Sequence, residues 1–541
     1  MSHFSSRNSS AIMVYAFTLP TTSPLSFQSF ITSPTHPSLP QSASTARHAL
    51  RVTLKAHKRL PRGPRQDAHL PAVLSALNEY IPYLFAIYNS LSDKPISDFQ
   101  SATDGYTSGA GLRTGELEIV LRAEIESAWR PTLSSNAFNI TSGRNSSSGK
   151  GVKTHNGRVC GQGVHFELAF TLATLGYVLS RLARAGVVAA LYALTPPTAE
   201  ERTAAVQTAT RYLLQASAVH NFLASSPSTL NAVSTVPDLD ASTHSALSSL
   251  ALAEATLLAV LKDDAYVAAC IQSRNPNDKE WMVHAPEIPK VRALLFARLC
   301  VRAAEYSEQA AAGLGAVGAA SARTERVSEE VIRYTGVLGR VARARACRFF
   351  GVDAELSGKV GEGIAWLRAA RTPLGIRGGS QDEGSASGGP AKGGLSRLKR
   401  EWNERREERR VAKDAGSSGE KGPLDAGDDA GRGEEGQVIA MLEAKWVKMN
   451  DTINTQLIPP SAPLLSNLPS GRDIHSPPAP YQPPSLDNDQ MMRMQAIPDE
   501  RDDVNFGNDD DSEDETAGGL SADRTPGAFP DRSATASSVY Y

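Results

Sequence analysis

Apolar residues recur every three or four positions along most of the chain, and this spacing predicts a mainly helical protein. The helices expected from it cover residues 45–60, 70–92, 165–186, 198–225, 240–264, 291–311, 326–356 and 434–453. Pro82 should bend the second of these helices or mark a break in it. No repeat of fixed length accompanies the helices, so we expect an irregular, solenoid-like stack of helix pairs.

One segment follows a different period. Leu117, Ile119, Leu121 and Ile125 alternate with mostly polar residues, which predicts a half-buried strand over residues 117–126. It is the only clear strand signal in the chain. Any sheet is therefore expected to be small.

The helix expected at 291–311 carries two apolar stripes. When it is wound at about 100° per residue, one side gathers a complete core face. That face consists of Ala293, Leu294, Phe296, Ala297, Cys300, Val301, Ala303 and Ala304. The other side holds Leu295, Leu299 and Tyr306 in a row among Arg292, Arg298 and Arg302. The second stripe either receives a partner or is covered by another part of the same chain.

Composition divides the chain into a folded body and long unstructured stretches. Of the 541 residues 41% are hydrophobic but only 6% are aromatic, and there are 42 glycines and 33 prolines. We expect an N-terminal extension (1–12), a folded domain (13–488) and a disordered acidic tail (489–541). Flexible insertions are expected near 134–163, 375–394 and 415–435, with a highly charged helix at 395–414. From Pro459 the Pro-rich sequence predicts no fold of its own.

Charge is distributed unevenly along the chain. Residues 487–541 contain 14 acidic and 4 basic residues, so the net charge of −2 leaves about +8 on the preceding residues. Such a body suits acidic surfaces. The tail could compete weakly with an acidic partner for the stripe at Leu295 and Leu299, or it could serve only to keep the protein soluble. Ser512, in "DDDSEDE", is a possible phosphorylation site.

A basic run within the first expected helix could contact anionic lipid. Alternatively, it is an ordinary solvent-exposed helix face without a ligand. The run consists of Arg47, Arg51, Lys55, Lys58 and Arg59. Aromatic residues that could stack on bases are not interleaved with these charges, which argues against binding to RNA. We therefore expect no nucleic-acid partner.

Signals for catalysis, metals and cofactors are weak. "GLGAVG" (313–318) matches a dinucleotide-binding pattern, but it follows a helix rather than a strand, so an interhelical loop is expected. The four cysteines are not at metal-ligand spacing, which favours a reducing compartment. No stretch approaches 18 apolar residues, so no membrane span is expected. We predict a protein that is not an enzyme and needs no cofactor or metal.

Several segments, taken in their order and spacing, resemble the Bro-type domain, the helical module of Alix and its relatives. They include "FTLPTT" (17–22), "LNEYIPYL" (77–84), "ESAWRPTLS" (126–134), "HFELAFTLATLGYVLSRLA" (165–183), "GEGIAWLRAA" (361–370) and "NDTINTQLIPPSAPLL" (450–465). The resemblance implies a boomerang-shaped, tetratricopeptide-like helical stack with a small sheet. It also implies a non-catalytic protein.

The resemblance further implies a partner. Bro-type domains bind the C-terminal amphipathic helix of the main ESCRT-III filament subunit in a surface groove. The positions that match the contact residues of relatives are Leu295 and Leu299, with Lys262 and Arg298 as basic neighbours; Arg302 and Tyr306 lie beside them. A large aromatic residue that relatives use near the groove is Ala259 here.

Within the family, the similarity is greatest to a fungal branch that acts in alkaline ambient-pH signalling. This implies an adaptor between a receptor/arrestin pH-sensing complex at the plasma membrane and ESCRT-III, upstream of the proteolytic activation of a transcription factor. Such a protein would be cytoplasmic and recruited peripherally to plasma-membrane or endosomal sites. The alternatives are a general endosomal sorting adaptor of the same fold and, less compatible with the sequence, an RNA-binding helical protein.

Overall fold

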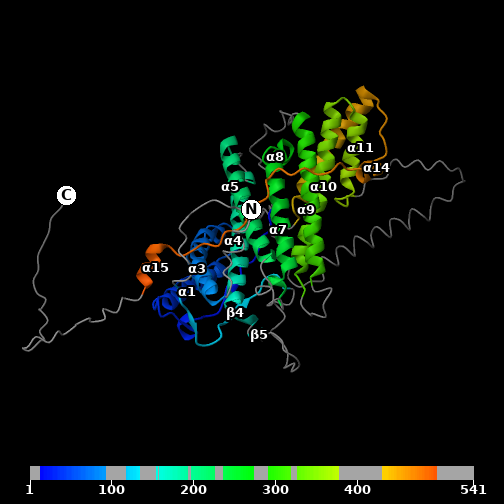
Figure 1. The fold of residues 1–541 in the computed structure, drawn as a ribbon. Coiled ribbons are helices and arrows are strands. Elements are labelled where there is room, and N and C mark those ends of the chain that lie inside the picture. The colour runs from blue at the N-terminus through cyan, green and yellow to red at the C-terminus, as the bar shows by residue number, and fades with distance from the viewer. Residues whose placement is uncertain are drawn as a thin grey trace, which may run out of the picture. The chain divides into compact units, whose positions relative to one another are not determined.

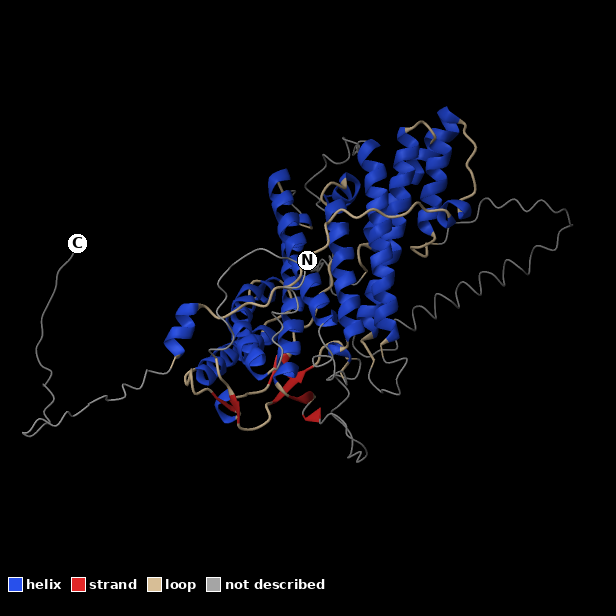
Figure 2. Ribbon diagram, in the orientation of Figure 1, coloured by secondary structure: helices blue, strands red, loops and turns tan. Residues whose placement is uncertain are grey.

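Long helices, each packed on the next one along the chain, form the body of the protein (Figures 1 and 2). The computed structural model describes residues 13–92, 117–134, 154–155, 157–192, 197–225, 236–272, 290–317, 326–376 and 429–495. The longer helices are α1 (Leu39–Arg59), α3 (Leu70–Leu91), α4 (Val164–Leu191), α5 (Ala199–Ser225), α7 (Ala241–Leu261), α9 (Lys290–Ala316), α10 (Glu329–Leu356), α11 (Val360–Arg371) and α13 (Arg432–Met449). The predicted mainly helical stack is confirmed.

Shorter elements complete the described part of the chain. They are α2 (Pro64–Asp67), α8 (Ala265–Gln272), α14 (Ala462–Ser466), α15 (Asn488–Met494), the 3-10 turns Phe27–Ser29 and Pro237–Leu239, and a π-turn over Asn450–Asn454. α3 runs unbroken through Pro82. A break at this proline, one of the two expected outcomes, is therefore excluded.

Local sequence explains where several helices begin. The capping box before α5 forms in both directions: the Thr198 amide donates to Glu201 Oε2 at 2.9 Å, and the Glu201 amide donates to Thr198 Oγ1 at 3.2 Å. Asp240 caps α7 and Ser328 caps α10 with side-chain oxygens. These caps fix the residues at which three helices of the stack begin.

Three helical segments have the length and hydropathy of membrane-spanning helices: Pro64–Leu91, Val164–Leu191 and Ala241–Leu261. The expectation that no segment is apolar enough is therefore wrong. The fold buries 50%, 72% and 83% of their most apolar windows, respectively. Central helices of a stack are apolar on most sides because other helices surround them, and this accounts for the composition of α4 and α7.

A small four-stranded sheet covers one end of the stack (Figure 2). Its order is β1 (Thr21–Thr22), β4 (Glu126–Arg130), β6 (Arg158–Gln162) and β5 (Thr154–His155), with antiparallel neighbours throughout. A separate pair joins β2 (Ile31–Thr32) to β3 (Val120–Leu121). The small sheet expected from the sequence is confirmed.

The strand expected at 117–126 is displaced. Only β3 lies inside that range, and both of its residues are exposed; the strand with a buried face is β4, which places Trp129 in the core. The loop expected over 134–163 also contains β5 and β6. A Cβ on Gly161 of β6 would lie 2.2 Å from the ring of Phe166, so close packing requires the glycine that made this stretch look like a loop.

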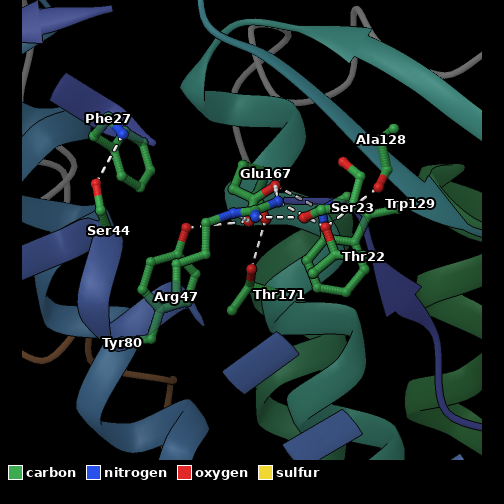
Figure 3. A network of polar contacts seen from close by, with 10 residues as sticks. All are labelled: Thr22, Ser23, Phe27, Ser44, Arg47, Tyr80, Ala128, Trp129, Glu167 and Thr171. Atoms are coloured by element: carbon green, nitrogen blue, oxygen red, sulfur yellow. Dashed lines mark hydrogen bonds and ion pairs between the residues drawn. The ribbon is translucent and has the colours of Figure 1, made fainter. Parts of the chain in front are cut away.

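A buried ion pair joins α1 to α4 and the sheet (Figure 3). Arg47 Nε donates to Glu167 Oε1 at 2.8 Å, and both side chains are almost fully buried. Trp129 Nε1 donates to Glu167 Oε2 at 2.6 Å, and Tyr80 Oη donates to Oε1 at 3.1 Å. Burial alone would raise the pKa of Glu167. The charge of Arg47 and the hydrogen bonds from Arg47 and Trp129 outweigh that effect, so the pKa lies below its ordinary value. The pair is therefore ionised inside the core.

A second buried cluster fixes α13 on α10. Arg345 Nε donates to Glu435 Oε2 at 2.9 Å, and Arg348 Nε donates to Glu435 Oε1 at 2.6 Å. Arg348 also pairs with Asp264, which precedes α8. Two arginines and two carboxylates thus balance within the core, which is the condition for burying charge without a large penalty.

Other expected boundaries change in detail. α9 continues to Ala316, so Gly313 lies in a helix rather than in a loop; a Cβ there would lie 3.1 Å from Ala246 Cβ on α7, and glycine allows the two helices to approach. α13 begins at Arg432, inside the insertion expected at 415–435.

The expected disorder from residue 489 is wrong for its first residues, because α15 forms and Met494 is buried there. The charged helix at 395–414, the extension 1–12 and the tail beyond residue 495 lie outside the described residues, as does Ser512.

Candidate partner-binding groove

A groove of about 1290 Å³ opens between α5, α7 and α9. Leu214 of α5 and Leu295 of α9 contribute to its apolar lining, together with Ala259 at the end of α7. Arg211, Lys262 and Arg292 add positive charge to the same lining. The groove therefore combines an apolar lining with cations. Of the stripe predicted on α9, Arg292, Leu295 and Leu299 line it, whereas Arg298, Arg302 and Tyr306 do not.

α9 presents a slightly different face to this groove than the helical wheel indicates. Ala293, Phe296, Ala297 and Cys300 are buried as expected. Leu294, predicted to be core, is 46% exposed, whereas Leu299, predicted to be exposed, is only 1% exposed. Both leucines are thus misassigned by the wheel. Leu295 is half-buried and lines the groove.

An extended segment of the same chain crosses this face of α9 (Figure 1). We call residues 470–482 the strap. The Arg472 amide donates to the carbonyl oxygen of Arg298 at 3.1 Å, and the Gly471 amide donates to Glu305 Oε1 at 3.3 Å. A Cβ on Gly471 would lie 2.6 Å from Arg302 Cα, so only glycine permits this approach of backbone to helix.

One carboxylate fastens the strap to the cationic face. Asp473 Oδ1 accepts from Arg302 Nε at 2.8 Å and from Tyr306 Oη at 2.7 Å. The hydrogen bond from Arg302 holds the pKa of Asp473 below its ordinary value. The Arg302 guanidinium also lies 4.4 Å from the centre of the Tyr306 ring. Arg302 and Tyr306 are therefore engaged within the chain rather than free for a partner.

The strap continues across the groove to α5. Its residues from Ile474 to Gln482 line the same hollow as Leu295 and Leu299. At the far end, the Tyr481 ring packs edge-on against Phe222 of α5, with the ring centres 5.4 Å apart. Burial there raises the pKa of Tyr481. The sequence predicted no structure for this Pro-rich segment, and its ordered course over α9 and α5 corrects that expectation.

Part of the apolar stripe is thus covered by the chain itself, as the alternative to a partner site supposed. Leu295 is half-buried in the lining of the groove, which also includes Lys262. Lys262 Nζ lies 3.7 Å from Asp263 Oδ2, and an Arg292 guanidinium nitrogen lies 3.8 Å from the same oxygen. Two cations share one carboxylate, so this rim of the groove keeps a positive excess. The partner role of these residues stays a prediction.

The basic run of α1 divides into one buried and four accessible residues. Arg47 is wrongly placed on that surface, because its guanidinium pairs with Glu167 in the core. Arg51, Lys55, Lys58 and Arg59 are half-buried or exposed. Arg130 of β4 and Arg158 of β6 join them, and neither was predicted from the sequence. In the part of the chain that the structure describes, no group of three or more His, Cys, Asp and Glu side chains could hold a metal ion.

The protein is a helical stack with a small sheet and a cation-lined groove. The family model of the BRO1-like domain matches residues 128–413, and the chain belongs to this family. Over 98% of its length it is 57% identical to the pH-response regulator protein palC of Emericella nidulans, all of which the match covers. The resemblance inferred from the sequence is confirmed.

Solved structures give a weaker likeness. A structure of ALIX in complex with the SIVmac239 PYKEVTEDL late domain has a TM-score of 0.47 and 14% identity. The match covers 87% of this chain and 49% of that one, so the present chain spans about half of that ALIX chain. A complex of the ALIX BRO1 domain with CHMP4C has a TM-score of 0.43 and 13% identity. That match covers 87% of the present chain and 96% of the other one.

Proposed function

We propose that this protein is a non-catalytic adaptor in alkaline ambient-pH signalling. It binds the C-terminal amphipathic helix of the main ESCRT-III filament subunit in the groove between α5, α7 and α9. The observation that carries the proposal is the half-buried Leu295 in an apolar groove rimmed by Lys262 and Arg292. Membership of the BRO1-like family and the similarity to a pH-response regulator support it.

The size of the groove suits a helix better than a small molecule. Pockets for small ligands are about 300–1,000 Å³ in volume, and this groove exceeds that range. An incoming amphipathic helix would place apolar anchors against Leu295 and Leu214, as in other helix-in-groove complexes. Arg211, Lys262 and Arg292 would face acidic residues that flank those anchors. The small side chain of Ala259 leaves room in the lining for such an anchor.

The other end of the adaptor would meet the pH-sensing receptor/arrestin complex at the plasma membrane. The protein would then bring ESCRT-III to that complex, where a separate protease activates a transcription factor. This role places it in the cytoplasm, recruited peripherally to plasma-membrane or endosomal sites. The similarity to palC over the whole length of that relative supports the pH-specific role over general endosomal sorting.

A binding titration of the full chain with a synthetic C-terminal ESCRT-III helix tests the proposal. Leu295→Asp should weaken binding by roughly 10-fold or more, because a carboxylate would replace an apolar anchor contact. Leu294→Asp is the matched control: Leu294 is exposed on the same helix and does not line the groove. Equal affinities of both variants and the unchanged protein would refute binding in this groove.

A further inference from the structure

A second hollow, of about 470 Å³, lies where the C-terminal turns of α1 meet the sheet. It is lined by Thr21, Lys55, Lys58, Arg59, Arg130 and Arg158. Five of these six residues are cationic and none is acidic. The groove between α5 and α9 shares none of its lining, so this is a separate surface.

Three elements bring the cations together. Lys55, Lys58 and Arg59 follow one another at helical spacing on α1, so they project from one side of it. Arg130 pairs with Thr21 across β4 and β1, and Arg158 comes from β6 on the other side of β4. The Arg130 guanidinium lies against Gly157, where a Cβ would be 3.0 Å from its Nη2. The convergence thus depends on tertiary structure and not on one charged helix face.

Nothing in the described part of the chain neutralises these cations. No carboxylate within it forms an ion pair with any of the five, and Arg51, one turn earlier on α1, has a buried Nε without a hydrogen-bond partner. Burial and the charges of Arg51, Arg158 and Arg59 lower the pKa of Lys55. Burial and the charges of Arg130 and Arg158 likewise lower the pKa of Lys58. The cations therefore repel one another, and an anion between them would remove that repulsion.

We propose that this hollow binds a compact polyphosphate, of the kind found in a phosphorylated inositol headgroup, either free or carried by a lipid. Arginine and lysine at several angles suit phosphate oxygens, since guanidinium groups bind them in a bidentate manner. The volume lies within the range of small-ligand pockets. The lining holds no aromatic side chain for stacking on bases, so a nucleic acid is a poorer fit.

The test uses the full chain and two probes. Isothermal titration with inositol hexakisphosphate measures binding of the free anion. Flotation with phosphatidylcholine vesicles that contain phosphatidylinositol bisphosphate measures binding of the lipid form, and vesicles matched in charge with phosphatidylserine serve as the reference. Binding of inositol hexakisphosphate should weaken as salt rises. Inositol hexakisphosphate, when bound, should also raise the melting temperature of the protein.

The triple variant Lys55→Gln/Arg130→Gln/Arg158→Gln should bind inositol hexakisphosphate roughly 100-fold more weakly, because each lost charge near an anion weakens binding about five-fold. The matched control, Arg340→Gln/Lys445→Gln/Lys448→Gln, removes three exposed cations from α10 and α13 and should bind as the unchanged protein does. If the triple variant fails to fold, Lys58→Gln/Arg59→Gln, at two exposed positions, tests the same hollow.

Each outcome decides the proposal. Binding of inositol hexakisphosphate that the hollow variants lose and the control keeps supports it, and vesicle binding then shows whether the lipid form is also a ligand. Absence of binding to the free anion, or equal losses in the hollow and control variants, would overturn it in favour of a solvated or non-specific basic face. Equal flotation with both kinds of anionic vesicle, beside specific binding of the free anion, would assign the hollow to the free anion alone.

Discussion

Asp473 Oδ1 lies 2.8 Å from Arg302 Nε, so a residue near the C-terminal end of the described chain is bonded to the cationic face of α9. Asp473 and Arg302 are 171 positions apart, and the strap between α9 and α5 depends on this contact and on the backbone bonds beside it. A partner helix bound at the apolar stripe would therefore have to displace or accommodate the strap.

Asp473→Ala should loosen the strap and strengthen binding of the ESCRT-III helix. The ion pair is partly exposed, and such pairs contribute about 0.2–1 kcal/mol, so the gain in affinity should be at most about five-fold. Hydrogen exchange at the Arg472 amide should become faster in parallel. Asp451→Ala, at an exposed position outside the strap, is the control. Unchanged or weaker binding by the Asp473 variant would show that the strap does not compete with the helix.

The two leucines of the predicted stripe should respond differently to a charge. Leu299→Asp places a carboxylate in the core and should destabilise the fold by about 3 kcal/mol or more. Leu295→Asp should leave the melting temperature nearly unchanged and lose binding, because its side chain is half-buried at the groove. Thermal unfolding by circular dichroism separates them. A sharp loss of stability in both variants would make Leu295 a core residue.

Arg47→Ala should destabilise the protein far more than Arg59→Ala, although both arginines belong to α1. Removing Arg47 leaves Glu167 buried without its counter-charge, which costs about 3–5 kcal/mol in comparable cases. Arg59 is exposed, so its removal should change stability by less than about 0.5 kcal/mol. Urea unfolding of both variants measures the difference. Glu167→Gln in the Arg47→Ala background should recover part of the loss, and failure to do so would contradict an ionised pair.

Glu254 should make stability depend on pH. Burial raises its pKa to about 7 from 4.5, while the Tyr15 amide and the Tyr334 hydroxyl donate to its Oε1. A raised pKa means that the folded state holds the proton more tightly. The stabilisation is therefore complete below about pH 4.5 and is lost as pH rises through about 7. The loss should be on the order of 3 kcal/mol.

Glu254→Gln removes the titrating proton and keeps an oxygen that accepts both hydrogen bonds. Its unfolding free energy should exceed that of the unchanged protein at pH 8 and match it near pH 4.5. Glu79→Gln, at an exposed position of α3, controls for the change in net charge. Parallel pH profiles for the unchanged protein and the Glu254 variant would mean that folding does not raise the pKa of Glu254.

Local signals in the sequence are enough to locate the helices. The Thr198–Glu201 capping box and the apolar period of α4 act within a few residues, and both predictions are confirmed. The Bro-type resemblance adds the family and the neighbourhood of Leu295 and Lys262. The partner role of those two residues is still a prediction.

The rest depends on contacts between distant parts of the chain. Arg47 and Lys55 look alike on α1, and only Glu167, 120 positions after Arg47, makes the first a core residue. The wheel of α9 placed Leu299 on an exposed face because it cannot include the strap, which lines the groove beside Leu299. Arg130 and Arg158 carry no local sign that strand pairing will place them beside α1.

The two ends of the segment between α11 and α13 meet at one place. A Cβ on Gly436 would lie 3.1 Å from Ile376 Cδ1, and the Arg345–Glu435–Arg348 cluster holds α13 there. Closing a loop becomes only slowly more costly as the loop lengthens. We therefore expect that a change in the length of residues 377–428 alters the cost of joining α11 to α13 only slightly. Because the Arg345–Glu435–Arg348 cluster holds α13 on α10 by itself, chain added between α11 and α13 need not displace either helix.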